Sequence, residues 1–148
     1  MATTDTAKAV ASRLRELLAS GGPEALMAEV LDHYGDKVTV SHDPPSPHDA
    51  VLEGAQLKAM SGAETAAVRK AIPDFRLDGP ISDAGNTVTT DLTLTGTLGD
   101  GTPIRMHVET TYTLEDGQFV SVHAKADPAE GEGLMKAMLS AGFEIPQP

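Results

Sequence analysis

The chain has 148 residues and a mass of 15.4 kDa, with 22 Asp and Glu against 11 Lys and Arg, a net charge of −11, and no cysteine. This composition excludes disulfide frameworks, thiolate metal sites and cysteine nucleophiles. It also disfavours nucleic acid and anionic membranes as partners, because their phosphates must be neutralised by clustered cations. No stretch approaches the roughly 20 apolar residues that span a bilayer. With no apolar signal segment near Met1, we expect a single cytoplasmic domain over residues 1–148.

The first half of the chain predicts three helices and one strand. Residues 5–20 and the segment from Pro23 to Gly35 carry apolar side chains at helical spacing, and Gly35 suits the C-terminal cap of the second helix. Residues 38–41 form a short strand, and the proline-rich stretch 44–54 reads as a loop. A third helix is expected from about 55 to 72, with a break where Ser61 and Glu64 have the spacing of a capping box.

The second half changes to the period of two that is typical of strands. We expect strands over 75–83, 87–98, 104–114 and 119–126, with hairpin turns at Gly85–Asn86, Gly99–Gly101 and Asp116–Gly117. A short amphipathic helix over 130–140 follows. Helices segregated from a run of antiparallel strands indicate an α+β domain whose helices pack on one face of the sheet.

Several motifs resemble those of the nuclear-transport-factor-2-like superfamily, which includes ketosteroid isomerases and SnoaL-like polyketide cyclases. They are YGDKVTVSHDP at 34–44, AIPDF at 71–75, and YTLEDG at 112–117 followed by a strand that ends in Asp127. The resemblance implies a curved antiparallel sheet wrapped around three N-terminal helices, which leaves a conical cavity for an apolar small molecule. It also implies a homodimer through the outer face of the sheet. Only three Phe, two Tyr and no Trp are present, which fits either an open interior or an ordinary aliphatic core.

Asp43 is the first candidate catalytic residue. The resemblance places it, at a strand end before Pro44, where ketosteroid isomerases hold the general base that moves a proton beside a carbonyl. Asp before Pro is also common at the start of a turn, which leaves a structural role open. By strand alternation only one of His42 and Asp43 faces the cavity, so both are candidates.

The expected ligand-binding residues lie on one face of the strands. They are Tyr112, Thr110, Thr90, Met106, Val122 and Ala124. The resemblance is incomplete, because the first helix has no Tyr, Thr110 stands where isomerases have Asp, and Ala124 stands where cyclases and limonene epoxide hydrolases have Asp. Tyr112 can supply a phenol or simply pack in the core. Two functions therefore stay open: proton-transfer chemistry of the isomerase or cyclase kind, and a noncatalytic ligand-binding or dimerisation module.

Two further groups of titratable residues are candidates for a metal site or for acid and base catalysis. His107 and His123 share the opposite strand face with Arg105, Glu109 and Lys125, which indicates a polar outer face and no metal site. Glu64 can pair with Asp43 as two carboxylates for acid and base catalysis, or cap a helix. No nucleotide or cofactor motif is present, and we expect no cofactor.

Overall fold

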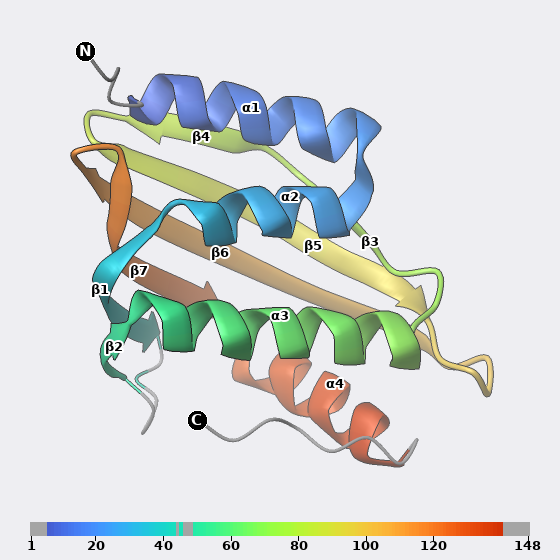
Figure 1. The fold of residues 1–148 in the computed structure, drawn as a ribbon. Helices are drawn as coiled ribbons and strands as arrows, with labels where there is room; N and C mark the ends of the chain where they lie inside the picture. The colour runs from blue at the N-terminus through green and yellow to red at the C-terminus, as the bar shows by residue number, and fades with distance from the viewer. Residues whose placement is uncertain (1–5, 44, 46–48, 141–148) are drawn as a thin grey trace.

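The computed structural model describes residues 6–43, 45 and 49–140, and it places helices on one side of a curved, open sheet (Figure 1). The helices are α1 (Ala7–Ser20), α2 (Gly22–Asp32), α3 (Gly54–Ala71) and α4 (Pro128–Ser140). The strands are β1 (Tyr34–Asp43), β2 (Ala50–Glu53), β3 (Arg76–Asp78), β4 (Ile81–Ala84), β5 (Thr87–Thr97), β6 (Pro103–Glu115) and β7 (Gln118–Ala126). The predicted α+β class is confirmed. No helix among these residues is long and apolar enough to cross a membrane.

The sheet runs in the order β2-β1-β7-β6-β5-β3, and β4 also pairs with β5, beyond β3 along the same edge of that strand. It is mixed and not wholly antiparallel as expected, because β1 runs parallel to β7. A bulge lies where β6 meets β7, since Leu114 pairs with Phe119 while Thr113 pairs with Ser121. The extra residue keeps both Phe119 and Val122 on the helix-facing side although they are three positions apart.

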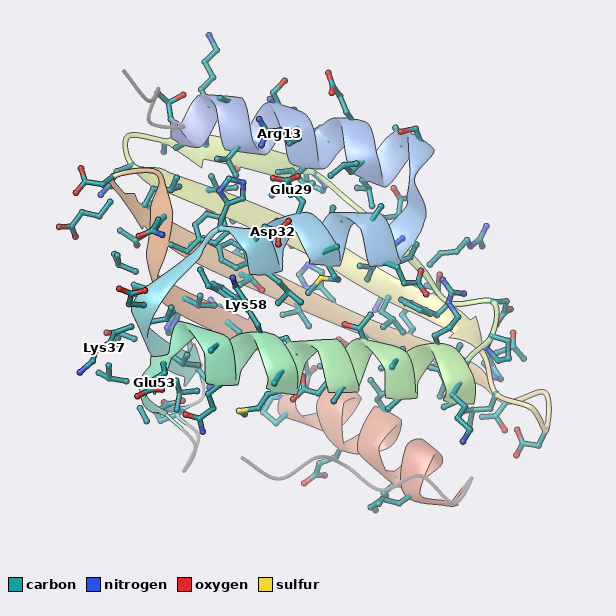
Figure 2. All side chains as sticks on the ribbon, in the orientation of Figure 1. Arg13, Glu29, Asp32, Lys37, Glu53 and Lys58 are labelled. Atoms are coloured by element: carbon teal, nitrogen blue, oxygen red, sulfur yellow. The ribbon has the colours of Figure 1, made fainter. Side chains whose placement is uncertain are left out.

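Helices α1 and α2 cover one half of this helix-facing side. Thr6 caps α1 by accepting a hydrogen bond from the backbone N–H of Ala9 at 3.1 Å, and Val10 and Leu14 of that helix are fully buried. Between the helices, Nη1 of Arg13 donates to Glu29 Oε2 at 3.0 Å, and Figure 2 shows the two side chains directed toward one another. The same Glu29 oxygen lies 2.7 Å from Nε2 of buried His33, the residue that follows α2 as its C-terminal cap.

Helix α3 packs against α2, β1 and β2 and crosses in front of the lower part of the sheet (Figure 1). Its first residue, Gly54, lies so close to β1 that a Cβ there would be 1.9 Å from the carbonyl oxygen of Gly35. Farther along, Ala71 and Ile72 join Phe75 and Leu98 in a second hydrophobic cluster beside the main cluster beneath α1 and α2. The buried core thus has two clusters, and half-buried Leu77 packs against both.

The structure corrects four local expectations. Residues 50–53 form strand β2 within the expected loop, and the single strand expected over 75–83 is two strands separated at Gly79. Gly79 has φ +143°, and a Cβ there would be 2.1 Å from the carbonyl oxygen of Asp91, so a close backbone approach requires glycine. Helix α2 ends at Asp32, because Gly35 belongs to β1. Helix α3 continues through Ser61 without the expected break.

Two glycines of α3 provide a stability test. Gly54→Ala should destabilise the fold by about 1–3 kcal/mol, because its methyl group must displace the helix from the backbone of β1. Gly62→Ala in the same helix has no heavy atom within 4 Å of the added Cβ, and it should stabilise the protein by up to about 1 kcal/mol through helix propensity. Urea unfolding of both variants measures the difference, and equal effects would contradict the close approach of α3 to β1.

Candidate functional site

Strand pairing decides which side of the sheet each candidate occupies. In the register of the sheet, His42 pairs with Ala124, Ala124 with Thr110, and Thr110 with Thr90. Paired residues project to the same face, and Thr90 is only 4% exposed beneath the helices. His42 therefore belongs to the helix-facing side.

Asp43 falls in the next row, on the opposite side. It pairs with Lys125, Lys125 with Glu109, and Glu109 with Asp91. Asp43 is exposed, and the structure does not bring it to the helix-facing residues or to Glu64. The alternation of side chains thus gives His42 to the interior and Asp43 to the outer face, and a catalytic role of Asp43 stays a prediction that its position disfavours.

Part of the helix-facing side is only half-buried and lies outside the two hydrophobic clusters, although α4 packs on β6 close to Met106. Five half-buried side chains of the sheet belong to neither cluster, and we call them the open patch: His42, Met106, Val108, Thr110 and Ala124. The middle of α3 also lies outside both clusters. Leu57 belongs to the first cluster and Val68 packs against the second, with Ser61 and Glu64 between them. Side chains that are apolar, accessible and next to polar groups are typical of ligand sites.

A buried phenol reaches α3 from the start of β1. Tyr34 is 7% exposed, its ring lies edge-on to Phe119 with centroids 6.1 Å apart, and its hydroxyl group is hydrogen-bonded with the side chain of Ser61. Burial raises the pKa of Tyr34 well above its ordinary value, and the nearby Glu64 carboxylate also raises it. The phenol therefore keeps its proton, and it can act only as a hydrogen-bonding group.

Glu64 is the carboxyl group that the fold places beside these residues. Its side chain is reached by solvent, yet the surrounding protein removes part of its hydration, and this desolvation raises its pKa above the ordinary value of 4.5. His42 acts in the opposite direction, because its positive charge would favour the carboxylate. Among the described residues, no hydrogen bond or ion pair holds the Glu64 carboxyl group. Glu64 is thus an accessible carboxyl group whose pKa lies above its ordinary value because of desolvation.

His42 is held by a carboxylate of its own. Its Nδ1 lies 2.6 Å from Oδ1 of Asp49, and both side chains are partly exposed. Because a carboxylate only accepts hydrogen bonds, this contact assigns the proton of the neutral imidazole to Nδ1. The other nitrogen, Nε2, then carries the lone pair that can take up a proton.

Tyr112, the phenol that the sequence suggested, is buried in the hydrophobic core. It is 6% exposed and stacks on Phe119 with ring centroids 4.6 Å apart. Its hydroxyl group is hydrogen-bonded with the side chains of Thr90 and Thr110, while burial raises its pKa to about 12. Tyr112 and Thr90 therefore support the site from beneath.

The remaining ligand-binding candidates divide by exposure. Met106, Thr110 and Ala124 belong to the open patch, whereas Val122 is 8% exposed in the first hydrophobic cluster. The sequence did not single out Tyr34, Ser61 or Asp49 as site residues. For Tyr34 and Ser61 the signal was weak, because a bulge in β1 and the unbroken course of α3 bring them together.

The outer face carries polar side chains as expected. Ser41 Oγ lies 2.7 Å from His123 Nδ1, and His107 Nε2 contacts the carboxylate of Asp91. Among the described residues, no three His, Asp or Glu side chains come together as metal ligands. These pairs stabilise a solvated sheet surface.

The raised pKa of Glu64 predicts how stability depends on pH. Since the folded state binds this proton more tightly than the unfolded chain, the contribution of Glu64 is most favourable below about pH 4.5 and is lost as the pH rises through its raised value. Glu64→Gln should therefore have the higher melting temperature at neutral pH, and the difference should vanish near pH 4. Thermal unfolding from about pH 4 to pH 8 measures this, with exposed Glu53→Gln as the control. A constant difference over that range would contradict the shift.

No protein-family profile matches the chain, and no curated protein matches its sequence. Solved structures do match. A proposed polyketide cyclase from Acidithiobacillus ferrooxidans is 24% identical over 93% of this chain and 99% of its own, with a TM-score of 0.60. The pinacolase BvnE from Penicillium brevicompactum is 14% identical over 95% and 97%, with a TM-score of 0.62. An epoxide hydrolase of M. tuberculosis that resembles limonene epoxide hydrolase is 15% identical over 89% and 94%, with a TM-score of 0.55.

These structures share the fold of the chain along almost its whole length. Their identities are too low to transfer an activity, and one fold of this kind carries many chemistries. The resemblance read from the sequence is confirmed at the level of the fold: the chain has the nuclear-transport-factor-2-like fold.

Proposed function

We propose that the protein binds an apolar small molecule with a carbonyl oxygen against the open patch and catalyses a proton transfer within it, as isomerases and cyclases do. The observation that carries this proposal is the pairing of an acid with a base at one site. Desolvation raises the pKa of Glu64 on α3, which makes it a better proton donor near neutral pH than an ordinary carboxyl group, and Glu64 interacts electrostatically with His42 on β1. His42 has Nε2 free to accept a proton because Nδ1 donates to Asp49.

The two groups have complementary roles. Glu64 donates its proton to the carbonyl oxygen of the ligand, while Nε2 of His42 removes a proton from the adjacent carbon. The product is a neutral enol, and the positive charge formed on His42 is balanced by Asp49 at 2.6 Å and by the carboxylate left on Glu64. The step moves only protons, so it needs no cofactor.

The open patch suits the apolar body of such a ligand. Met106, Val108 and Ala124 offer apolar contact surface, and Thr110 adds a hydroxyl group at the edge nearest His42. Tyr34, positioned by Ser61, is a second group that can orient a polar atom of the ligand. Similar arrangements of a few polar groups within an apolar lining are common in small-molecule sites.

Deuterium exchange into β-tetralone tests the proposed chemistry. This apolar ketone has exchangeable protons beside its carbonyl group, and proton NMR in deuterium oxide follows their loss. The protein should accelerate the exchange, and Glu64→Gln and His42→Gln should each reduce the acceleration by about a hundredfold, the usual contribution of one acid or base. Asp83→Asn, which removes an exposed carboxylate of β4, is the control that should retain it.

Asp43→Asn discriminates between the two candidate bases. Because Asp43 lies on the outer face, this variant should exchange β-tetralone at the rate of the parent protein. If Asp43→Asn lost the acceleration of exchange while His42→Gln kept it, the base would be Asp43 and not His42. No acceleration by the parent protein would contradict the proposed proton transfer.

A noncatalytic module that forms a homodimer is the second candidate. The phenols of Tyr34 and Tyr112 already have hydrogen-bonding partners inside the protein, which favours a structural role for them. The outer face of the sheet offers charges of both signs, as in the row of Asp43, Lys125 and Glu109. Such a surface is complementary to a copy of itself related by two-fold symmetry.

Sedimentation velocity tests this second candidate. A dimer through the outer face should dissociate in Thr111→Arg, because a long cation in the middle of β6 obstructs the contact, while Ala66→Arg on the exposed side of α3 should leave it intact. A parent protein that sediments as a monomer would exclude the module as proposed.

A further inference from the structure

Glu64 has a negative charge when ionised, and the surrounding side chains decide whether that charge is balanced. His42 and Tyr34 of β1 both interact electrostatically with Glu64, while Asp49 lies 2.6 Å from Nδ1 of His42 and Ser61 is hydrogen-bonded with Tyr34. Only His42 among them can become a cation, and Asp49 already neutralises it. The described part of the site therefore offers no free positive charge to an incoming anion.

The basic residues of α3 do not change this balance. Arg69 binds both carboxylate oxygens of Glu24, at 2.5 Å and 2.7 Å, and its third hydrogen bond goes to the carbonyl oxygen of Pro73. Lys58 is exposed near the start of the helix, and Figure 2 shows it in the space between α2 and α3. Among the described residues neither side chain is paired with Glu64, whose carboxyl group stays accessible.

We infer that the site selects its ligands by charge: it takes uncharged apolar molecules and excludes organic anions, and Glu64 is the residue that decides this. The inference rests on the proposed function, because it concerns the ligand bound at the same patch. Two negative charges a few ångström apart near a protein surface repel strongly enough to weaken binding at least tenfold. An anion would also have to give up hydration without gaining a cationic partner.

The protonation of Glu64 sets when this exclusion operates. At neutral and higher pH the carboxylate repels an anion, and as the pH falls the protonated acid no longer does. The raised pKa of Glu64 moves this change toward neutral pH. His42 lies in the same site, so the experiment must separate its contribution from that of Glu64.

Two naphthalene probes with the same ring system, one neutral and one anionic, test the inference. Naphthalenemethanol is neutral, and naphthalenesulfonate keeps its negative charge at every pH used. Their dissociation constants are measured by fluorescence at about pH 8 and about pH 5, at an ionic strength that limits electrostatic range to about 8 Å. We expect the sulfonate to bind at least tenfold more weakly than the alcohol at the higher pH, with a smaller gap at the lower pH.

Two variants with the same net charge assign the effect. Glu64→Gln should close the gap at the higher pH by improving the affinity for the sulfonate while leaving that for the alcohol within about twofold. Glu53→Gln makes the same change in net charge at an exposed position of β2 and should leave the gap unchanged. Any pH dependence that persists in Glu64→Gln does not come from Glu64.

The possible failures are distinguishable. If the alcohol and the sulfonate both fail to bind, the proposed function falls. If the alcohol binds and the sulfonate binds equally well, or if Glu64→Gln leaves the gap in place, the open patch holds ligands but Glu64 does not select them, and the inference is overturned. Closure of the gap by Glu53→Gln as well would assign the exclusion to the overall charge of −11 and would also overturn it.

Discussion

The parallel pairing of β1 with β7 is the constraint on which the arrangement of this protein depends. It joins β1, from the first half of the chain, to the last strand, and thereby aligns Tyr34 with Phe119 and His42 with Ala124. Tyr34 and His42 are eight positions apart, so alternation along β1 turns both toward the helices although the pairing shifts between Tyr34 and Thr39. A one-residue slip would exchange His42 for Asp43 and remove the base from the site.

The interior shows how a fold can hold polar groups without leaving them unsatisfied. Among the described residues, every buried side-chain nitrogen or oxygen has a hydrogen-bonding partner. The phenol of Tyr112 is held between two threonines, and His33 between Glu29 and the carbonyl oxygen of Gly117. The carboxyl group of Glu64 differs from these buried groups, because it is exposed and has no hydrogen-bonding partner among the described residues.

Division of the core into two clusters gives that carboxyl group its place. Helix α3 contributes to both clusters through its two ends, so its middle spans the interval between them. The fold alone does not determine what occupies it, since the same architecture recurs in a pinacolase, an epoxide hydrolase and a designed protein with a curved sheet.

The sequence by itself determined the class of fold, the helices α1 and α3, and the two long hairpins, because these follow from local periodicity and turn residues. It also placed His42 and Asp43 on opposite faces, without saying which face was which. Only the tertiary structure decided that question, since the answer depends on pairing between strands about eighty residues apart. The same holds for β2, for the break at Gly79 and for the contacts of Tyr34 with Ser61 and of His42 with Asp49. Each of these depends on how closely backbone segments far apart in the sequence approach one another, and local residue patterns do not determine that.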